Sequence, residues 1–123
     1  MASSRAAIAF ALARIAFGAG LVVAPQRVAS GWLPGDAERP QTQVAIRGLG
    51  ARDLALAGGI VLAAREGRGL RPWVAGCVAC DLADIASTLA AGGALPARAR
   101  WGTVALAGAS AVIGAAVAAG ADS

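Results

Sequence analysis

The chain has 123 residues, of which 58% are apolar and 4% are aromatic, and its formal net charge is +4. The apolar residues form long blocks instead of alternating with polar ones, which excludes an ordinary soluble core. Histidine is absent, and the eleven basic residues, all arginine, are scattered without stacking aromatics. This composition excludes a Ser-His-Asp triad, a histidine metal or haem site, and nucleic acid as a partner.

The first apolar block, residues 6–24, is long enough to cross a hydrocarbon core of about 30 Å as a helix. A cleaved signal peptide is the alternative interpretation. Arg14 interrupts the apolar region and Pro25 follows the only plausible cleavage site, so we expect a retained helix. The polar residues 25–43 that follow are predicted to form an ordered loop or a short surface helix, with Trp32 in the lipid headgroup layer.

Three further apolar blocks have the length of a membrane span, at residues 41–64, 72–91 and 101–120. In lipid, only helices and closed barrels satisfy the backbone polar groups of such segments. The sequence therefore predicts an all-α fold, specifically a membrane-embedded up-down four-helix bundle. Residues 1–123 form a single integral membrane domain in this prediction.

The connections between the spans carry arginines on both sides of the membrane, four in the inner and four in the outer segments for an N-terminus inside. The dense cluster in residues 65–71 and the terminal amine favour a cytoplasmic N-terminus. We expect a multi-pass protein of the inner (plasma) membrane of a bacterium. Its partner is the lipid bilayer, and a homo-oligomer or a larger membrane complex stays open.

Charged residues lie inside three of the four predicted spans. They are Arg14, Arg47, Arg52, Asp53, Asp81 and Asp84. A charge at the centre of a membrane helix costs roughly 2.5–3.5 kcal/mol on insertion scales. Such groups persist only by pairing with one another or by lining water, and their formal charges here sum to zero. We therefore predict a buried charge network.

Depth along the helices predicts which of these charges meet. The second and third spans are antiparallel, and Arg52 lies as far before the end of one as Asp84 lies after the start of the other. Arg14 and Asp81 lie at matching depths in the parallel first and third spans. The predicted pairs are Arg52 with Asp84 or Asp81, and Arg14 with Asp81.

Helical angles predict one polar face on the third span. At 100° per residue this face carries Cys77, Cys80, Asp81, Asp84 and Thr88. Arg47 points away from Arg52 on the second span and lies nearer the membrane surface, where its side chain can snorkel. Without Arg47, the core holds two arginines and three carboxylates, and one aspartate then has reason to be protonated.

The cysteines form the sequence Cys77-Val-Ala-Cys80, a spacing known from disulfide exchange. Four-helix membrane oxidoreductases of the DsbB and vitamin K epoxide reductase type use such a pair beside a quinone. They also need a second cysteine pair, which this chain lacks. We therefore expect two reduced thiols without a catalytic role, and neither a cofactor nor a metal.

The small residues in two spans favour close packing of helices. The run from Arg47 to Asp53, RGLGARD, follows no strand and lacks the ending of a phosphate loop, so its glycines are interpreted as packing positions. Ser110, Gly114 and Ala118 form a small-residue face on the fourth span.

The pair Asp81 and Asp84 invites comparison with membrane prenyl- or CDP-alcohol transferases. The magnesium–pyrophosphate motifs of those enzymes have more carboxylates, at other spacings, so the sequence argues against this class.

Two stretches, RGLGARDLALAGGIVLAAR and WVAGCVACDLADIASTLAA, are joined by a basic turn. They resemble uncharacterised small four-span bacterial membrane proteins, which carry an Arg-Gly-x-Gly-x-Arg-(Asp/Glu) run in the second span and Asp-x-x-Asp in the third. The likeness covers about residues 40–91. A looser similarity to DoxX-type proteins rests on four-span topology. The resemblance implies a four-span fold and no particular reaction.

Three functions fit this pattern. The first is a structural or accessory membrane protein, not an enzyme, whose charges set helix packing. The second is a membrane-embedded acid/base enzyme on a lipid-like or isoprenoid substrate, with Asp81, Asp84 or Asp53 as catalytic candidates. The third is a small transporter or proton conduit. An enzyme needs a cavity beside the carboxylates, a conduit needs a wet path to them, and the first function needs neither.

Overall fold

The computed structural model describes residues 2–121, and every regular element in that range is helical, so the all-α class is confirmed. The four long helices are α1 (Ala2–Val23), α3 (Pro40–Glu66), α4 (Leu70–Ala91) and α5 (Ala97–Ala119). They lie where the four spans were predicted. A fifth helix, α2 (Pro25–Trp32), forms within the polar connection. Short 3-10 turns at Pro34–Asp36 and Gly92–Ala94 lie in the α2–α3 and α4–α5 connections.

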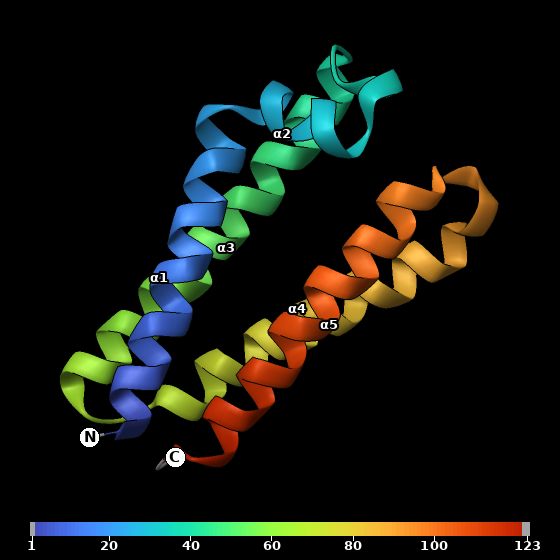
Figure 1. The fold of residues 1–123 in the computed structure, drawn as a ribbon. Helices are drawn as coiled ribbons and strands as arrows, with labels where there is room; N and C mark the ends of the chain where they lie inside the picture. The colour runs from blue at the N-terminus through green and yellow to red at the C-terminus, as the bar shows by residue number, and fades with distance from the viewer. Residues whose placement is uncertain (1, 122–123) are drawn as a thin grey trace.

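The long helices pack as two antiparallel pairs, α1 with α3 and α4 with α5 (Figure 1). Contacts between the pairs are fewer and come mostly from α3 and α4. Both ends of the chain and the α3–α4 turn lie at one end of the molecule, and α2 and the α4–α5 turn lie at the other. The order of the long helices is therefore up and down.

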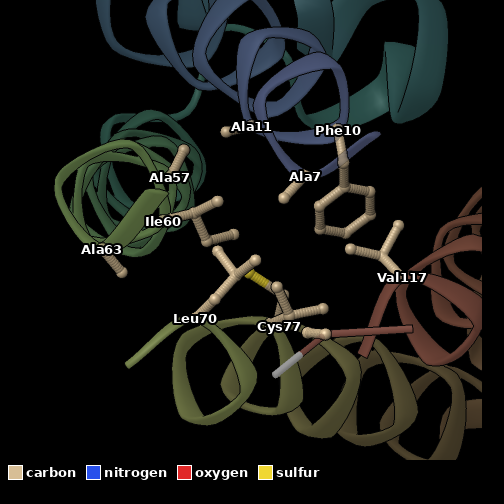
Figure 2. Packing of buried hydrophobic residues seen from close by; sticks show 11 residues of the cluster. Ala7, Phe10, Ala11, Ala57, Ile60, Ala63, Leu70, Cys77 and Val117 are labelled. Atoms are coloured by element: carbon tan, nitrogen blue, oxygen red, sulfur yellow. The ribbon is translucent and has the colours of Figure 1, made fainter. Parts of the chain in front are cut away.

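All four long helices contribute to a hydrophobic cluster toward the end that holds the termini (Figure 2). Phe10 of α1 points toward Val117 of α5, while Ile60 of α3 and Val74 of α4 are fully buried. Many other members are alanines, so the helix backbones approach closely. The outer faces expose large apolar side chains such as Leu12, Leu62 and Val112.

Among the described residues, three helices are long and apolar enough to cross a membrane: Ser4–Val23 of α1, Leu70–Ala94 and Ala97–Ala119. The helix α3 is as long but falls outside this set because it carries Arg47, Arg52 and Asp53 within its apolar stretch. Whether α3 counts as a fourth span therefore depends on how those charges are compensated.

Glycines bring the helices of each pair together. A Cβ atom added at Gly18 of α1 would lie 2.8 Å from the backbone oxygen of Gly50 in α3, and one at Gly50 would lie 2.6 Å from the oxygen of Gly18. A Cβ at Gly114 of α5 would lie 2.8 Å from Val78 of α4. The predicted packing role is thus confirmed for Gly50 and Gly114, while Gly48 faces open space.

The end of the molecule that carries α2 is held by Trp32. Its half-buried indole donates a hydrogen bond from Nε1 to Thr103 Oγ1 of α5 at 2.9 Å. A smaller hydrophobic cluster, made of Leu21, Ala29, Ala37 and Ile46, lies under α2. The side chain that was expected in the headgroup layer therefore connects α2 to the second helix pair.

Candidate functional site: a buried arginine–aspartate network

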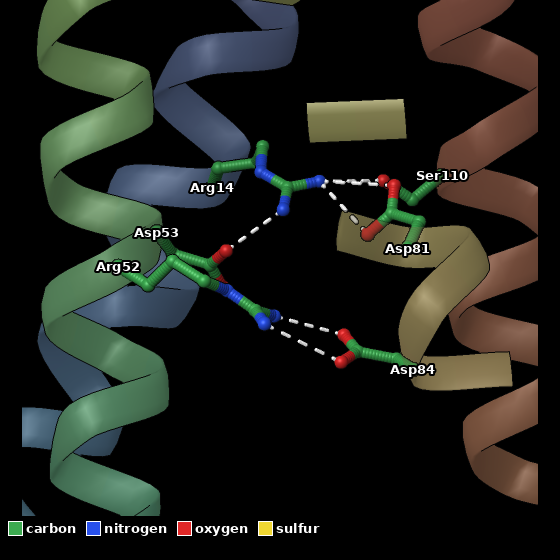
Figure 3. A network of polar contacts seen from close by, with 6 residues as sticks. All are labelled: Arg14, Arg52, Asp53, Asp81, Asp84 and Ser110. Carbon is green, nitrogen blue, oxygen red and sulfur yellow. Dashed lines mark hydrogen bonds and ion pairs between the residues drawn. The ribbon is translucent and has the colours of Figure 1, made fainter. Parts of the chain in front are cut away.

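Arg14 is the centre of a polar network between the two helix pairs (Figure 3). Its Nη2 donates to Asp53 Oδ1 of α3 at 2.7 Å, and its Nη1 lies 3.2 Å from Asp81 Oδ2 and 3.3 Å from Asp81 Oδ1 of α4. Nη1 also donates to Ser110 Oγ of α5 at 2.9 Å. One guanidinium on α1 therefore contacts a side chain from each of the other three long helices.

The three charged members of this centre are almost fully enclosed. Arg14 is 8% exposed, and Asp53 and Asp81 are each 4% exposed. The guanidinium also lies over the ring of Phe10, 5.5 Å from its centroid. Because the enclosed pairs are shielded from water, their attraction is screened much less than that of a surface ion pair.

A second ion pair joins α3 to α4 on the more exposed side of the network. Arg52 Nη2 lies 2.9 Å from Asp84 Oδ2, and Nη1 lies 3.4 Å from Oδ1, so the guanidinium faces both carboxylate oxygens. About a third of each side chain is exposed. Since Arg52 precedes Asp53, the two ion-paired groups are adjacent along α3.

The glycine contacts explain why the network forms at this level. Gly18 lies one helical turn after Arg14, and Gly50 lies just under a turn before Asp53. Their backbone contact brings α1 and α3 close enough for the 2.7 Å bond. Gly114, one turn after Ser110, does the same for α5 against α4. The small residues and the charges therefore work as one arrangement.

Both pairs that depth matching predicted are present, namely Arg52 with Asp84 and Arg14 with Asp81. Sequence reasoning missed the shortest contact, between Arg14 and Asp53, because the rotation of the first span about its axis could not be inferred. It also treated Ser110 only as a small packing residue. The available signal was that Ser110 is the one serine in a span without central charges.

The prediction that Arg47 belongs to the buried network is wrong. Its side chain is exposed, and its Nε donates to the carbonyl oxygen of Val22, at the end of α1, at 3.2 Å. Its position on α3 turns it away from α4 and toward the helix ends, as the angular argument indicated. The network therefore contains two arginines and three aspartates, Asp53, Asp81 and Asp84, which are the three catalytic candidates.

The cysteines lie on the α4 face that points into the molecule. Cys77 is fully buried in the hydrophobic cluster of Figure 2, Cys80 is half-buried, and both are free. Thr88 is buried two turns further along the same helix. Within residues 2–121 there is no group of three or more Cys, Asp or Glu side chains suited to hold a metal ion.

Two hollows on the molecule lie away from the network. One, of about 300 Å³, is lined by side chains around Trp32 and by the first turns of α3 as far as Leu49. The other, of about 440 Å³, is lined by residues of the α1–α2 junction together with Gln43 and Arg47 of α3. Neither is lined by an aspartate of the network. The carboxylates therefore contact arginines rather than the wall of either hollow.

Comparisons of the chain with protein-family models, with curated proteins and with solved structures found no match. Chemically, the arrangement offers a fixed cation shared by two carboxylates, with a second pair beside it. Such a site can tie helices together, and its carboxylates can also exchange protons. Among the described residues of the network, the hydroxyl of Ser110 accepts a hydrogen bond from Arg14.

Proposed function

We propose that this chain is a four-span integral membrane protein with a structural or accessory role, in which the arginine–aspartate network fixes how the helices meet. The observation that carries the proposal is the contact of Arg14 with Asp53, Asp81 and Ser110, one from each other long helix. Charged pairs in a membrane can form only when the right helices are adjacent and aligned. The network thus favours one arrangement over its alternatives.

The pairing also supports α3 as the fourth span. Asp53 is neutralised by Arg14, and Arg52 by Asp84, so neither charge of the pair faces lipid alone. Arg47 lies level with the last turn of α1, close to where a membrane boundary would fall. With these charges compensated, the cost of placing α3 in the hydrocarbon region falls to a level that its apolar residues can offset.

The resemblance to small four-span bacterial membrane proteins gains a physical meaning under this proposal. The two motifs that carry it contain Gly50, Arg52 and Asp53 in α3, and Asp81 and Asp84 in α4. These are the residues of the helix contact and of the network. We infer that such proteins share the same helix contact and arginine–aspartate network. We also place this chain in the inner membrane of a bacterium, with its termini on the cytoplasmic side.

A charge swap tests the structural role. Arg52→Asp alone and Asp84→Arg alone each place two like charges together, and we expect both to lower the folded yield in the membrane fraction severalfold. The double variant restores the pair and should recover most of that yield. Arg65→Asp, an exposed reversal in the α3–α4 region, serves as the control and should change little. No recovery in the double variant would contradict the proposal.

The membrane location itself is tested by extraction of isolated membranes. The chain should resist alkaline carbonate and enter solution only with detergent, because its exposed helix faces are apolar. Release by carbonate would exclude an integral membrane protein. It would leave the geometry of the network unchanged and would therefore overturn only the location.

A proton conduit is the second candidate, and the charge balance is the observation that favours it. Three aspartates share two arginines, so the network holds one carboxylate more than it has guanidinium groups, and about a third of each side chain of the Arg52–Asp84 pair is exposed. In liposomes with a trapped pH dye, a conduit would give a proton flux that Asp84→Asn abolishes. If the role is structural, liposomes with the wild type or with Asp84→Asn should show the same proton flux as liposomes without protein.

A further inference from the structure

A polar hollow lies where α1 ends and α2 begins, beside the first turns of α3; Figure 1 shows these elements at the end of the molecule opposite the termini. The hollow is open to one side and has a volume of about 440 Å³. The polar side chains in its lining are Gln26, Arg27, Ser30, Gln43 and Arg47. No residue of the arginine–aspartate network takes part.

The hollow carries two guanidinium groups and no carboxylate in its lining. Within residues 2–121, neither Arg27 nor Arg47 forms an ion pair. Of the two acids in the neighbouring connection, Asp36 pairs with Arg39 at 3.0 Å, and Glu38 accepts a hydrogen bond from Gln26. The lining itself therefore carries two positive charges, and the one carboxylate bonded to a lining residue is that of Glu38, on Gln26.

One of these arginines is held in place by the helix end that it faces. Arg47 donates from Nε to the carbonyl oxygen of Val22 at 3.2 Å, which ties its guanidinium to the last turn of α1. Among the described residues its Nη atoms have no partner, so they stay available as donors. A guanidinium fixed by one nitrogen and open at the others suits a planar or tetrahedral oxyanion.

The first turn of α2 adds donors of the same kind. Pro25 begins this helix, and Ala24 supplies no side-chain cap. The backbone N–H groups of Gln26 and Arg27 therefore have no partner within the helix, and the positive end of its dipole is directed at the hollow. Backbone donors and arginines together form the usual surroundings of a bound phosphate.

We propose that this hollow binds a phosphate group, supplied in the membrane by the headgroup of an anionic phospholipid. The apolar stretch of α1 ends at Val23, so the hollow lies at the level where hydrocarbon gives way to headgroups. Basic pockets at the ends of membrane helices bind anionic headgroups by this chemistry. The lipid source, unlike the phosphate chemistry, rests on the proposed membrane location.

Native mass spectrometry of the purified full chain from mixed phosphatidylglycerol and phosphatidylcholine micelles tests the site. Arg27→Gln/Arg47→Gln removes both charged donors of the hollow and should lower the retained ratio of phosphatidylglycerol to phosphatidylcholine well below that of the wild type. The matched control, Arg68→Gln/Arg98→Gln, removes the same charge from exposed positions outside the hollow and should keep most of the preference. Equal losses in both variants would overturn the site.

Thermal unfolding in uncharged detergent distinguishes the two sources of phosphate. If the site takes free phosphate, inorganic phosphate should raise the Tm of the wild-type chain above its value in chloride of equal ionic strength. If the site requires the lipid, only phosphatidylglycerol should raise the Tm. In either case Arg27→Gln/Arg47→Gln should remove the rise. Unchanged Tm with both probes overturns the proposal, whereas carbonate release alone would overturn only the membrane location.

Two controls accompany this experiment. Circular dichroism checks that each variant is folded. Arg27→Lys/Arg47→Lys keeps the charge and should retain part of the rise in Tm.

Discussion

Arg14 occupies an unusual position because a single side chain compensates two buried carboxylates. A guanidinium presents five N–H donors in a fixed plane and keeps its charge, so it can serve Asp53, Asp81 and Ser110 simultaneously. Arg52 and Asp84, by contrast, form one ordinary two-pronged pair that is partly exposed. The loss of Arg14 should therefore cost more than the loss of Arg52.

Arg14→Gln is expected to lower the free energy of unfolding by about 3–5 kcal/mol, since it leaves two enclosed aspartates without a cation. Tryptophan fluorescence during titration with sodium dodecyl sulfate in mixed micelles measures this change. Arg5→Gln, at an exposed position on the same helix, is the control and should stay within about 0.5 kcal/mol of the wild type. Equal effects of the two substitutions would show that the network is not what stabilises the fold.

The cysteines are expected to act only through packing. Cys77 is fully buried and Cys80 half-buried, one turn apart on a regular helix, a geometry in which a disulfide is strained. Cys77→Ala/Cys80→Ala should cost about 1 kcal/mol in the same titration, whereas Ile60→Ala in the same hydrophobic cluster should cost about 2–5 kcal/mol. A disulfide that cycles with a quinone in the native chain would instead support a redox function.

At the level of helices, the pairing was predictable because it depends on depth alone. A straight helix rises 1.5 Å per residue, so residue counts from the turns sufficed to match Arg52 with Asp84 and Arg14 with Asp81. The contact of Arg14 with Asp53 depends on the rotation of α1, which its nearly uniform apolar surface does not specify. The helix α2 was left open as a loop or a short helix because its eight residues begin with a proline and include a glycine.

The glycine contact between α1 and α3 should be sensitive to a single methyl group. Gly18→Ala places a Cβ atom 2.8 Å from the backbone oxygen of Gly50, and the helices must separate to admit it. We expect a loss of about 1–3 kcal/mol, and a weaker Arg14–Asp53 bond as a consequence. Gly20→Ala, where nothing lies within 4 Å, is the matched control and should be neutral or slightly stabilising.

The whole molecule consists of two helix pairs joined at three levels. The hydrophobic cluster around Ile60 and Val74 joins them near the termini, the arginine–aspartate network joins them in the middle, and Trp32 joins them at the α2 end. Each level uses a different interaction, so no single substitution away from Arg14 should separate the pairs. The proposed membrane location of both pairs also sets which connections share a side.

Labelling of introduced cysteines tests which connections share a side of the membrane. With four spans, the α2 connection and the α4–α5 turn lie on one side of the membrane, and the termini and the α3–α4 turn on the other. In a Cys77→Ala/Cys80→Ala background, Gly35→Cys and Gly93→Cys at exposed turns should react with an impermeant maleimide in intact cells. Arg5→Cys and Arg68→Cys should react only after the membrane is opened, because we propose a cytoplasmic N-terminus.

Each pattern of labelling has a distinct physical meaning. If all four sites exchange their behaviour, the orientation is wrong while the four spans stand, as expected when the arginines of the connections nearly balance across the membrane. If Gly35→Cys and Gly93→Cys react from opposite sides, then α3 or α4, the two long helices between them, fails to cross. The charged helix α3 is then the one to suspect, since it crosses only if Arg14 and Asp84 reach it from the neighbouring helices. Adding Arg14→Gln to the labelled variants separates these cases, because it should change the side from which Arg68→Cys and Gly93→Cys react only where the network holds α3 in the bilayer.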